Sequence, residues 1–143
     1  MCCLSKGLGA PVGSLVLGSA ERITACRRLR KALGGGMRQA GVLAAAGLIA
    51  LEEGPALMAE DHRRTRALAQ ALAALPAVEV DPAETNILFV TTRGDARREQ
   101  ARLEERGILT FALGARRLRF VFHRDVGDEA LEAAVAACRA IFG

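Results

Sequence analysis

The 143-residue sequence has no tryptophan and no tyrosine, and aromatic residues make up only 3% of it. Proteins that bind single-stranded nucleic acid without sequence preference stack the bases on aromatic side chains, so this composition argues against that class. Hydrophobic residues nevertheless make up 51% of the sequence, which is enough to build a core. We expect that core to consist of alanine, leucine, valine and isoleucine rather than of aromatic rings.

Cysteine is also scarce, and its spacing matches no familiar framework. Cys2, Cys3, Cys26 and Cys138 follow neither the pattern of a zinc site nor that of a disulfide scaffold. We therefore expect no metal site, and free thiols of the kind found in a reducing compartment.

Targeting signals and long hydrophobic runs are missing as well. No charged, apolar and cleavable leader precedes the first apolar residues, and no apolar run reaches the roughly twenty residues of a membrane span. The sequence therefore predicts a cytoplasmic protein without membrane contact. A transit peptide upstream of Met1 would instead direct the protein to mitochondria.

Positive charge is in slight excess, with 20 Lys and Arg against 16 Asp and Glu and a formal net charge of +4. Part of this excess is concentrated in RRLRK at residues 27–31, a segment able to attract nucleic acid or phosphate. Acidic residues are interspersed through most of the chain, so a solvated helix face explains the pattern better. We expect no nucleic-acid partner.

A glycine-rich segment near the start, CCLSKGLGAPVGS at residues 2–14, contains the lysine best placed for chemistry. Cys2, Cys3 and Leu4 are predicted to form a buried strand that small residues interrupt directly after Lys6. Lys6 would then lie at the carboxyl end of a strand, where open α/β sheets bind ligands and glycine lets the backbone approach a cofactor. An amine there becomes nucleophilic when desolvation or nearby cations disfavour its charged form. The alternative is a solvated lysine at the mouth of a turn.

Two motifs in register resemble the low-specificity L-threonine aldolases. SKGLGAPVGS at residues 5–14 and RKALGGGMRQAG at residues 30–41 resemble the segment with which these enzymes hold pyridoxal 5'-phosphate. The similarity continues through DPAETNILFV at residues 81–90 and RRLRFVFHRDV at residues 116–126 to the carboxyl terminus. It covers essentially the whole chain, which would correspond to the later part of such an enzyme.

The resemblance implies an α/β fold of the aminotransferase-like type in two parts. Residues 1–54 would be the end of the large, cofactor-binding domain, and residues 55–143 the small C-terminal α/β domain. It further implies a homo-oligomeric lyase that cleaves threonine, allo-threonine and related β-hydroxy-α-amino acids into glycine and an aldehyde. In that family the general base and most cofactor contacts come from the earlier half of the chain, so the 143-residue chain alone is expected to be inactive.

Two alternatives stay open at this point. The chain could be a catalytically inactive truncated homologue or a subunit-interaction module. It could also belong to another pyridoxal-phosphate enzyme of the same fold, such as serine hydroxymethyltransferase or an aminotransferase.

The resemblance also assigns roles to four residues. Lys6 would bind the cofactor covalently and act as the catalytic residue, while Lys31 and Arg38 would lie close to the cofactor. For Lys31, a simple cation at a helix carboxyl terminus explains the residue equally well. Arg119 would bind the α-carboxylate of the substrate, which suits a planar, two-pronged guanidinium. Fixing that carboxylate would orient the Cα–Cβ bond for cleavage, although a solvated arginine on a strand is the commoner case.

Five further residues receive weaker interpretations. Thr85 and Asn86 form a pair like that of the family, but a turn or cap explains them as well. His62 is predicted to be solvated, and His123 to cap its strand or orient a neighbour. Phe122 departs from the family, in which a small hydroxyl residue is usual.

Hydrophobic periodicity predicts strands separated by amphipathic helices. In residues 117–123, alternation places Leu118, Phe120 and Phe122 on the core face. Gly54 and Pro55 are expected to separate two helices, the first of them apolar nearly all round and therefore buried between elements or at a subunit contact. The predicted strands are 2–4, 14–17, 78–80, 86–91, 108–111 and 117–123, and the predicted helices are 19–33, 37–52, 56–75, 95–106 and 128–142.

Overall fold

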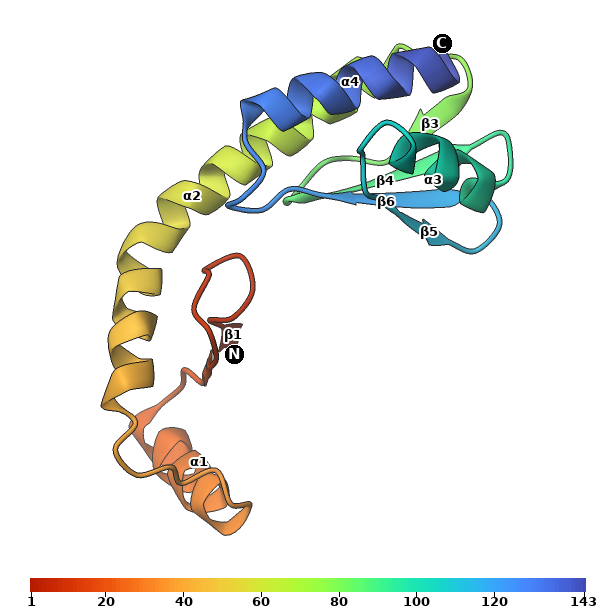
Figure 1. Cartoon of the computed structure of the whole chain (residues 1–143). Helices are drawn as coiled ribbons and strands as arrows, with labels where there is room; N and C mark the ends of the chain where they lie inside the picture. Colours follow the sequence, from red (N-terminus) through yellow and green to blue (C-terminus); the bar gives the residue numbers. More distant parts are fainter. The chain divides into compact units, whose positions relative to one another are not determined.

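A computed structural model describes the whole chain, residues 1–143 (Figure 1). The chain divides into two compact units, Met1–Leu57 and Met58–Gly143. The boundary lies inside one long helix, three residues after the predicted boundary at residue 54. The assignment of the two parts to a large and a small domain stays a prediction.

The first unit begins with a short antiparallel pair of strands, β1 (Cys2–Cys3) and β2 (Ser14–Leu15). The predicted strands over residues 2–4 and 14–17 are too long, and their predicted burial is confirmed only for Leu4. Both residues of β2 are exposed, and Val16 and Leu17 after it are 53% and 72% exposed. Two paired residues form too small a surface to pack against a second layer, so only Leu4 of these two segments is buried.

Helix α1 spans Ala20–Ala32 and confirms the helix predicted between Ser19 and Leu33. The Ser19 side chain accepts a hydrogen bond from the Arg22 backbone N–H at 3.4 Å, which satisfies one of the free donors at the helix start. Arg30 and Lys31 lie in the last turn, where cations favour the helix dipole. No residue of α1 is fully buried, and on its apolar side Ile23 and Cys26 are half-buried.

Helix α2 runs without interruption over Gly41–Ala73, so the prediction of two helices separated at Gly54 and Pro55 is wrong. A proline inside a helix removes one backbone hydrogen bond and costs about 3 kcal/mol. Packing on either side of the proline offsets that cost, since Gly54 lies against Leu8 in the first unit. Beyond the proline, Leu68 and Leu72 of the same helix are fully buried in the second unit.

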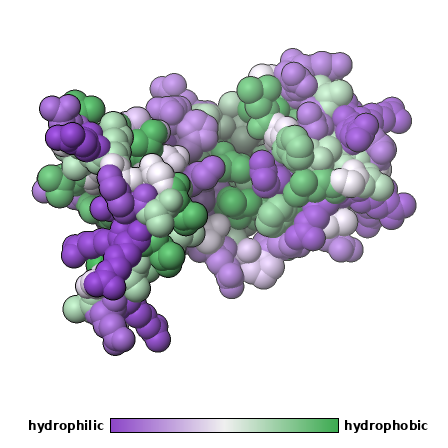
Figure 2. All heavy atoms as spheres, turned by 90° about the horizontal axis from the view of Figure 1, so that it is seen from below, coloured by the Kyte–Doolittle hydropathy of each residue, from purple (hydrophilic) through white to green (hydrophobic).

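The apolar first half of α2 is largely uncovered within this chain, so the predicted burial between the chain's own elements is wrong and the predicted subunit contact stays a prediction. Val42, Leu48 and Ile49 are 80%, 62% and 55% exposed, and hydrophobic residues are visible among hydrophilic ones on the surface (Figure 2). In this half of α2, only the side that includes Gly47 and Gly54 contacts other residues, because Leu4 and Leu8 pack against it.

Because α2 continues through Pro55, it is long and apolar enough to cross a membrane by length and composition alone, and 17% of its most apolar 18-residue stretch is buried. The sequence-based expectation of no spanning segment rested on the lack of an uninterrupted apolar run of about twenty residues. A single helix of this kind is weak evidence, since core helices of soluble proteins pass the same test.

The second unit contains a four-stranded antiparallel sheet with strand order β3-β4-β6-β5. The strands are β3 (Val78–Val80), β4 (Ile87–Thr92), β5 (Phe111–Leu113) and β6 (Arg117–Val121). The prediction for β3 is confirmed, and those for β4 and β6 are confirmed to within two residues at either end.

The strand predicted at residues 108–111 is displaced, and only Phe111 of it is in β5. Residues 107–108 instead close helix α3 (Ala96–Glu104). Gly107 has a φ of +77°, and the Ile108 N–H donates to the Leu103 carbonyl at 3.0 Å. Together they form a left-handed helix end, which sequence periodicity cannot distinguish from the start of a strand.

Helices cover one face of this sheet (Figure 1). They are the end of α2, α3 and α4 (Asp128–Phe142), the last matching its predicted range. Leu118, Phe120 and Phe122 are buried against them, which confirms the predicted core face of β6. The core also includes Leu68 and Leu72 of α2, Leu88 and Val90 of β4, Leu103 of α3 and Cys138 of α4, each fully buried.

One charged residue is buried where the sequence predicts a solvated face. Asp61 of α2 is only 1% exposed, because it lies one turn before Thr65 and two turns before Leu68 on the side of the helix that faces the core. The Thr65 hydroxyl donates to the Asp61 carbonyl at 2.8 Å, and the Asp61 carboxylate is 3.5 Å from the Arg64 guanidinium. The ion pair compensates part of the buried charge, while Asp61 Oδ1 accepts no hydrogen bond.

Candidate functional site

Lys6 lies in a tight loop between β1 and β2 that backbone hydrogen bonds hold in shape. The Lys6 carbonyl accepts from the Gly9 N–H at 2.9 Å, and Leu4 pairs with Ala10 and with Gly13, again at 2.9 Å. Gly9 and Gly13 have φ values of +80° and +123°, which side chains other than glycine rarely tolerate. The sequence therefore needs glycine at these positions for the loop to close around the lysine.

Two leucines on either side of Lys6 anchor the loop to helix α2. Leu4 packs against Gly47, and Leu8 packs so closely against Gly54 that a Cβ there would lie 2.6 Å from a Leu8 methyl carbon. Gly47 and Gly54 are two helical turns apart and so lie on one side of α2. The loop backbone is thus packed against α2, while the Lys6 side chain between the two leucines stays exposed.

The Lys6 amine takes part in none of the ion pairs of the chain. It is exposed, so this chain by itself does not desolvate it. The amine is therefore accessible but not enclosed.

Cys3 is the other reactive group of the loop. Its thiol lies 3.4 Å from the Ser5 hydroxyl. Hydrogen bonding by Ser5 is the main cause that lowers the pKa of Cys3, and the positive charge of Lys6 acts in the same direction. The sequence analysis did not single out this thiol.

Lys31 and Arg38 lie in the same unit as Lys6 but outside its loop. Lys31 is in the last turn of α1, and its side chain runs along the triple glycine, so that a Cβ on Gly36 would be 2.7 Å from a carbon of its stem. Arg38 precedes α2 and is exposed, as is Lys31. Neither forms an ion pair in the chain.

Arg119 lies in the second unit, on the sheet face that the helices leave open. Two arginines of β6 share this face, and each stacks over a phenylalanine: Arg117 over Phe89 at 4.6 Å and Arg119 over Phe111 at 5.3 Å from the ring centroid. The Arg117 guanidinium also donates to the Asp81 carboxylate. Arg119 has no carboxylate partner, and its Nε is buried without a hydrogen-bond acceptor.

The weaker candidates have structural explanations. Thr85 accepts a hydrogen bond from the Ile87 N–H at 3.2 Å, and the Asn86 amide donates to the Phe122 carbonyl at 2.7 Å. Both bonds fix the start of β4, as a turn or cap would. Phe122 is a core residue, and His62 is half-buried rather than solvated.

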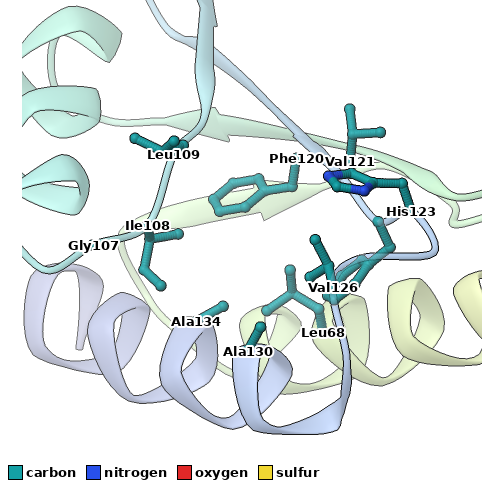
Figure 3. Close-up of a pocket in the computed structure, with 11 residues that line it drawn as sticks. Leu68, Gly107, Ile108, Leu109, Phe120, Val121, His123, Val126, Ala130 and Ala134 are labelled. Carbon is teal, nitrogen blue, oxygen red and sulfur yellow. The ribbon is translucent and has the colours of Figure 1, made fainter.

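A cavity in the second unit contains none of the predicted site residues. It has a volume of about 250 Å³ and is walled by apolar side chains of α2, α4 and β6, including Leu68, Phe120 and Ala134 (Figure 3). His123 is its one ionisable lining residue, with Nδ1 3.5 Å from an Asp125 carboxylate oxygen. The open sheet face around Arg119 is therefore a separate feature.

The two phenylalanines under the arginines were missed by the sequence analysis. The signal was present for Phe89, since alternation in the predicted strand places it away from the core. For Phe111 the sequence gives no such signal, because the strand predicted at residues 108–111 is displaced. The pairing of Phe111 with Arg119 depends on the observed register of β5 and β6.

Comparison with known proteins identifies the family. The beta-eliminating lyase family matches residues 1–95, which include the Lys6 loop, and the chain belongs to this family. Low-specificity L-threonine aldolase 1 of Arabidopsis thaliana is 43% identical over 130 residues, covering 87% of this chain and 36% of the relative. The low specificity L-threonine aldolase of Escherichia coli K12 is 42% identical over 139 residues, covering 96% of this chain and 41% of the relative.

The fold agrees with this family. A crystal structure from Exiguobacterium, assigned as an aromatic amino acid beta-eliminating lyase/threonine aldolase, superposes with a TM-score of 0.77 at 19% identity over 98% of this chain and 44% of that one. One from Listeria monocytogenes, assigned as an L-allo-threonine aldolase, gives 0.75 at 17% identity over 96% and 43%. The predicted aminotransferase-like α/β fold and the resemblance to threonine aldolases are therefore confirmed.

The chain spans about two fifths of the length of the curated relatives it matches. Enzymes of this family and the threonine aldolases are in general dependent on pyridoxal phosphate, whose chemistry needs a lysine amine.

Proposed function

We propose that this chain supplies the cofactor lysine and the substrate-binding arginine of a pyridoxal-phosphate-dependent threonine aldolase. The reaction would cleave threonine, allo-threonine and related β-hydroxy-α-amino acids into glycine and an aldehyde. Residues 1–54 would end the large domain, and residues 55–143 would form the small domain. On its own the chain would be inactive, because the general base would come from protein other than these 143 residues.

The residues of the first unit fit the aldehyde end of the cofactor. Lys6 offers a primary amine without a competing carboxylate, on a loop whose backbone is fixed by its seat on α2. Lys31 and Arg38 are cations without ion-pair partners in the chain and could neutralise a phosphate. When bound, the cofactor supplies the electron sink that accepts the electrons of the broken Cα–Cβ bond.

The unpaired guanidinium of Arg119 is the observation that carries the proposal on the substrate side. Arg117 and Arg119 share one face of β6, but Arg117 already pairs with Asp81 and Arg119 has no carboxylate partner. A carboxylate of the substrate would complete the pattern, through a bidentate pair that fixes its orientation. This orientation would align the bond to be broken, and positioning of this kind removes a large part of a reaction barrier.

We also propose that the complete protein is a cytoplasmic homo-oligomer. The uncovered apolar side of α2, with Val42, Leu48 and Ile49 exposed, supports a subunit contact over the alternative of a solvated helix. The same observation is compatible with the subunit-interaction module as a second candidate function, which differs in predicting no chemistry at Lys6.

A chimera tests the function. The part of the Escherichia coli aldolase that this chain matches would be replaced by the 143 residues, and release of glycine from threonine would be measured. We expect the chimera to cleave threonine and to show the yellow absorbance of bound cofactor. Lys6→Ala should abolish both, whereas Lys31→Ala should keep the absorbance.

The controls separate misfolding from lack of function. Circular dichroism and subunit mass establish that each chimera folds and assembles. A folded chimera that binds the cofactor and cleaves no threonine would contradict the aldolase assignment, and amino transfer by it would favour an aminotransferase instead. Turnover by the isolated 143-residue chain would contradict the expectation that it is inactive alone.

A further inference from the structure

The open face of the sheet in the second unit holds an arrangement that neither the family nor the relatives' names explain. An aromatic ring, Phe111, is 54% exposed although it is among the largest hydrophobic residues of the chain. Its one specific interaction is with the guanidinium of Arg119, whose Cζ lies 5.3 Å from the ring centroid. This distance is within the range of a cation–π contact.

We propose that Phe111 is a positioning residue for Arg119 and fixes the direction in which that arginine can bind a carboxylate. The proposal rests on the proposed function of Arg119 as the substrate-carboxylate site. It assigns to Phe111 no contact with the substrate.

Strand pairing brings the two side chains to the same place. Arg119 on β6 is directly opposite Phe111 on β5 and directly opposite Phe89 on β4, so all three project from the same face of the sheet. Phe89 is engaged elsewhere, because Arg117 stacks over its ring at 4.6 Å. Phe111 is therefore the ring on which Arg119 stacks.

The burial of the Arg119 Nε limits the direction from which a carboxylate can approach the guanidinium. The Nε of Arg119 is buried and has no hydrogen-bond acceptor, so a carboxylate cannot approach along the edge of the guanidinium that includes Nε. The remaining fork is formed by the two terminal nitrogens, which would meet a carboxylate end-on. A ring lying over the guanidinium carbon holds the plane in this orientation.

The neighbouring arginine shows what the same face does when a carboxylate is present. Arg117 also stacks on a phenylalanine, and its guanidinium donates to the Asp81 carboxylate of the chain. Both arginines thus stack on a phenylalanine ring. Arg117 has a carboxylate partner within the chain, whereas Arg119 is free to bind one from outside it.

Fluorine NMR of the 143-residue chain tests the proposal without cofactor or turnover. The chain has five phenylalanines and no other aromatic residue apart from two histidines, so 4-fluorophenylalanine labelling gives five signals. Sodium acetate is the carboxylate probe, and sodium chloride at equal ionic strength is the control. We expect a saturable acetate shift of the Phe111 signal and none of the Phe89 signal.

The variants separate stacking from bulk. Phe111→Leu keeps an apolar side chain but removes the ring, and should weaken acetate binding roughly two- to fivefold. It should also speed the exchange of the Arg119 Nε–H with water, measured by nitrogen-15 NMR. Phe111→Tyr should restore both values. Phe89→Leu, the matched control on the other side of Arg119, should leave them unchanged.

Two results would overturn the positioning role: a Phe111→Leu variant with unchanged Nε–H exchange, or a Phe89→Leu variant with the same effect as Phe111→Leu. A wild-type chain that binds no acetate would count against Arg119 as the carboxylate site, and so against the proposed function. In that case the Nε–H exchange rates of the variants would still decide whether Phe111 orients Arg119.

Discussion

Single side chains in this protein differ in reactivity for reasons that the structure makes explicit, and the cysteines are the clearest case. Cys138 is fully buried in the core, and burial raises the pKa of its thiol to about 12. Cys3 lies next to Ser5, whose hydrogen bond lowers the pKa of its thiol. We expect a disulfide reagent at pH 8 to modify Cys3 first and Cys138 only when the protein unfolds, because thiolates are the reacting species.

The same residue predicts a dependence of stability on pH. The unfolded Cys138 thiol ionises near its ordinary pKa of 9, whereas the folded one does so at about 12. Its stabilising contribution is therefore complete below pH 9 and is lost as the pH rises towards 12. Urea unfolding over this range should show a smaller fall in the free energy of unfolding for Cys138→Ala than for wild type. An equal fall would show that the thiol is not protected in the folded state.

At the scale of single residues, the sequence predicts function better than it predicts burial. The motifs around Lys6 and Arg119 were sufficient to indicate the family. They did not reveal that Asp61 is buried, because a charged residue on a helix is usually solvated. Nor did they reveal Phe111, since its role depends on a strand register that no local pattern encodes.

Secondary-structure elements determine how firmly the Lys6 loop is held. The Lys6 loop is seated on α2 through glycines, and Gly54 is the tightest of these contacts, with a Cβ there lying 2.6 Å from the Leu8 Cδ2 and 3.2 Å from its Cα. Gly54→Ala should destabilise the protein by about 1–3 kcal/mol through this overlap. The effect should exceed the gain of about 1 kcal/mol that alanine normally brings to a helix interior.

Gly41→Ala is the matched control, because a Cβ at Gly41 meets nothing within 4 Å. Thermal unfolding and limited proteolysis of the Lys6 loop measure the two effects together. Equal melting temperatures for the two variants, with equal protease resistance, would show that the loop does not depend on its seat at Gly54.

Elements were predicted well where local chemistry defines their ends. The Ser19 side chain caps α1, and the Asp95 side chain caps α3 by accepting from the Arg98 N–H at 3.0 Å, both at the predicted helix starts. The predicted break of α2 at Pro55 is wrong because tertiary packing, not local chemistry, decides whether the helix continues there. Proline is a strong local signal to stop a helix, but packing of residues before and after it keeps α2 continuous.

At the scale of the whole molecule, the chain places its two candidate groups in different units: Lys6 in Met1–Leu57 and Arg119 in Met58–Gly143. Under the proposed function, the exposed apolar residues of the first unit and the exposed Lys6 share one reason, because further protein would cover both. The sequence could indicate the family through its motifs. It could not indicate which surfaces stay open, because burial depends on everything that packs against them.

The most direct test of the account is to locate the cofactor on the chain. Lys6 and Lys31 are its only two lysines, so the chimera can be loaded with pyridoxal phosphate, reduced with borohydride, digested and mapped by mass spectrometry. The account predicts the modified residue to be Lys6, in the peptide that contains the SKGLGAPVGS segment. Modification of Lys31 with Lys6 unmodified, or of neither lysine, would contradict it.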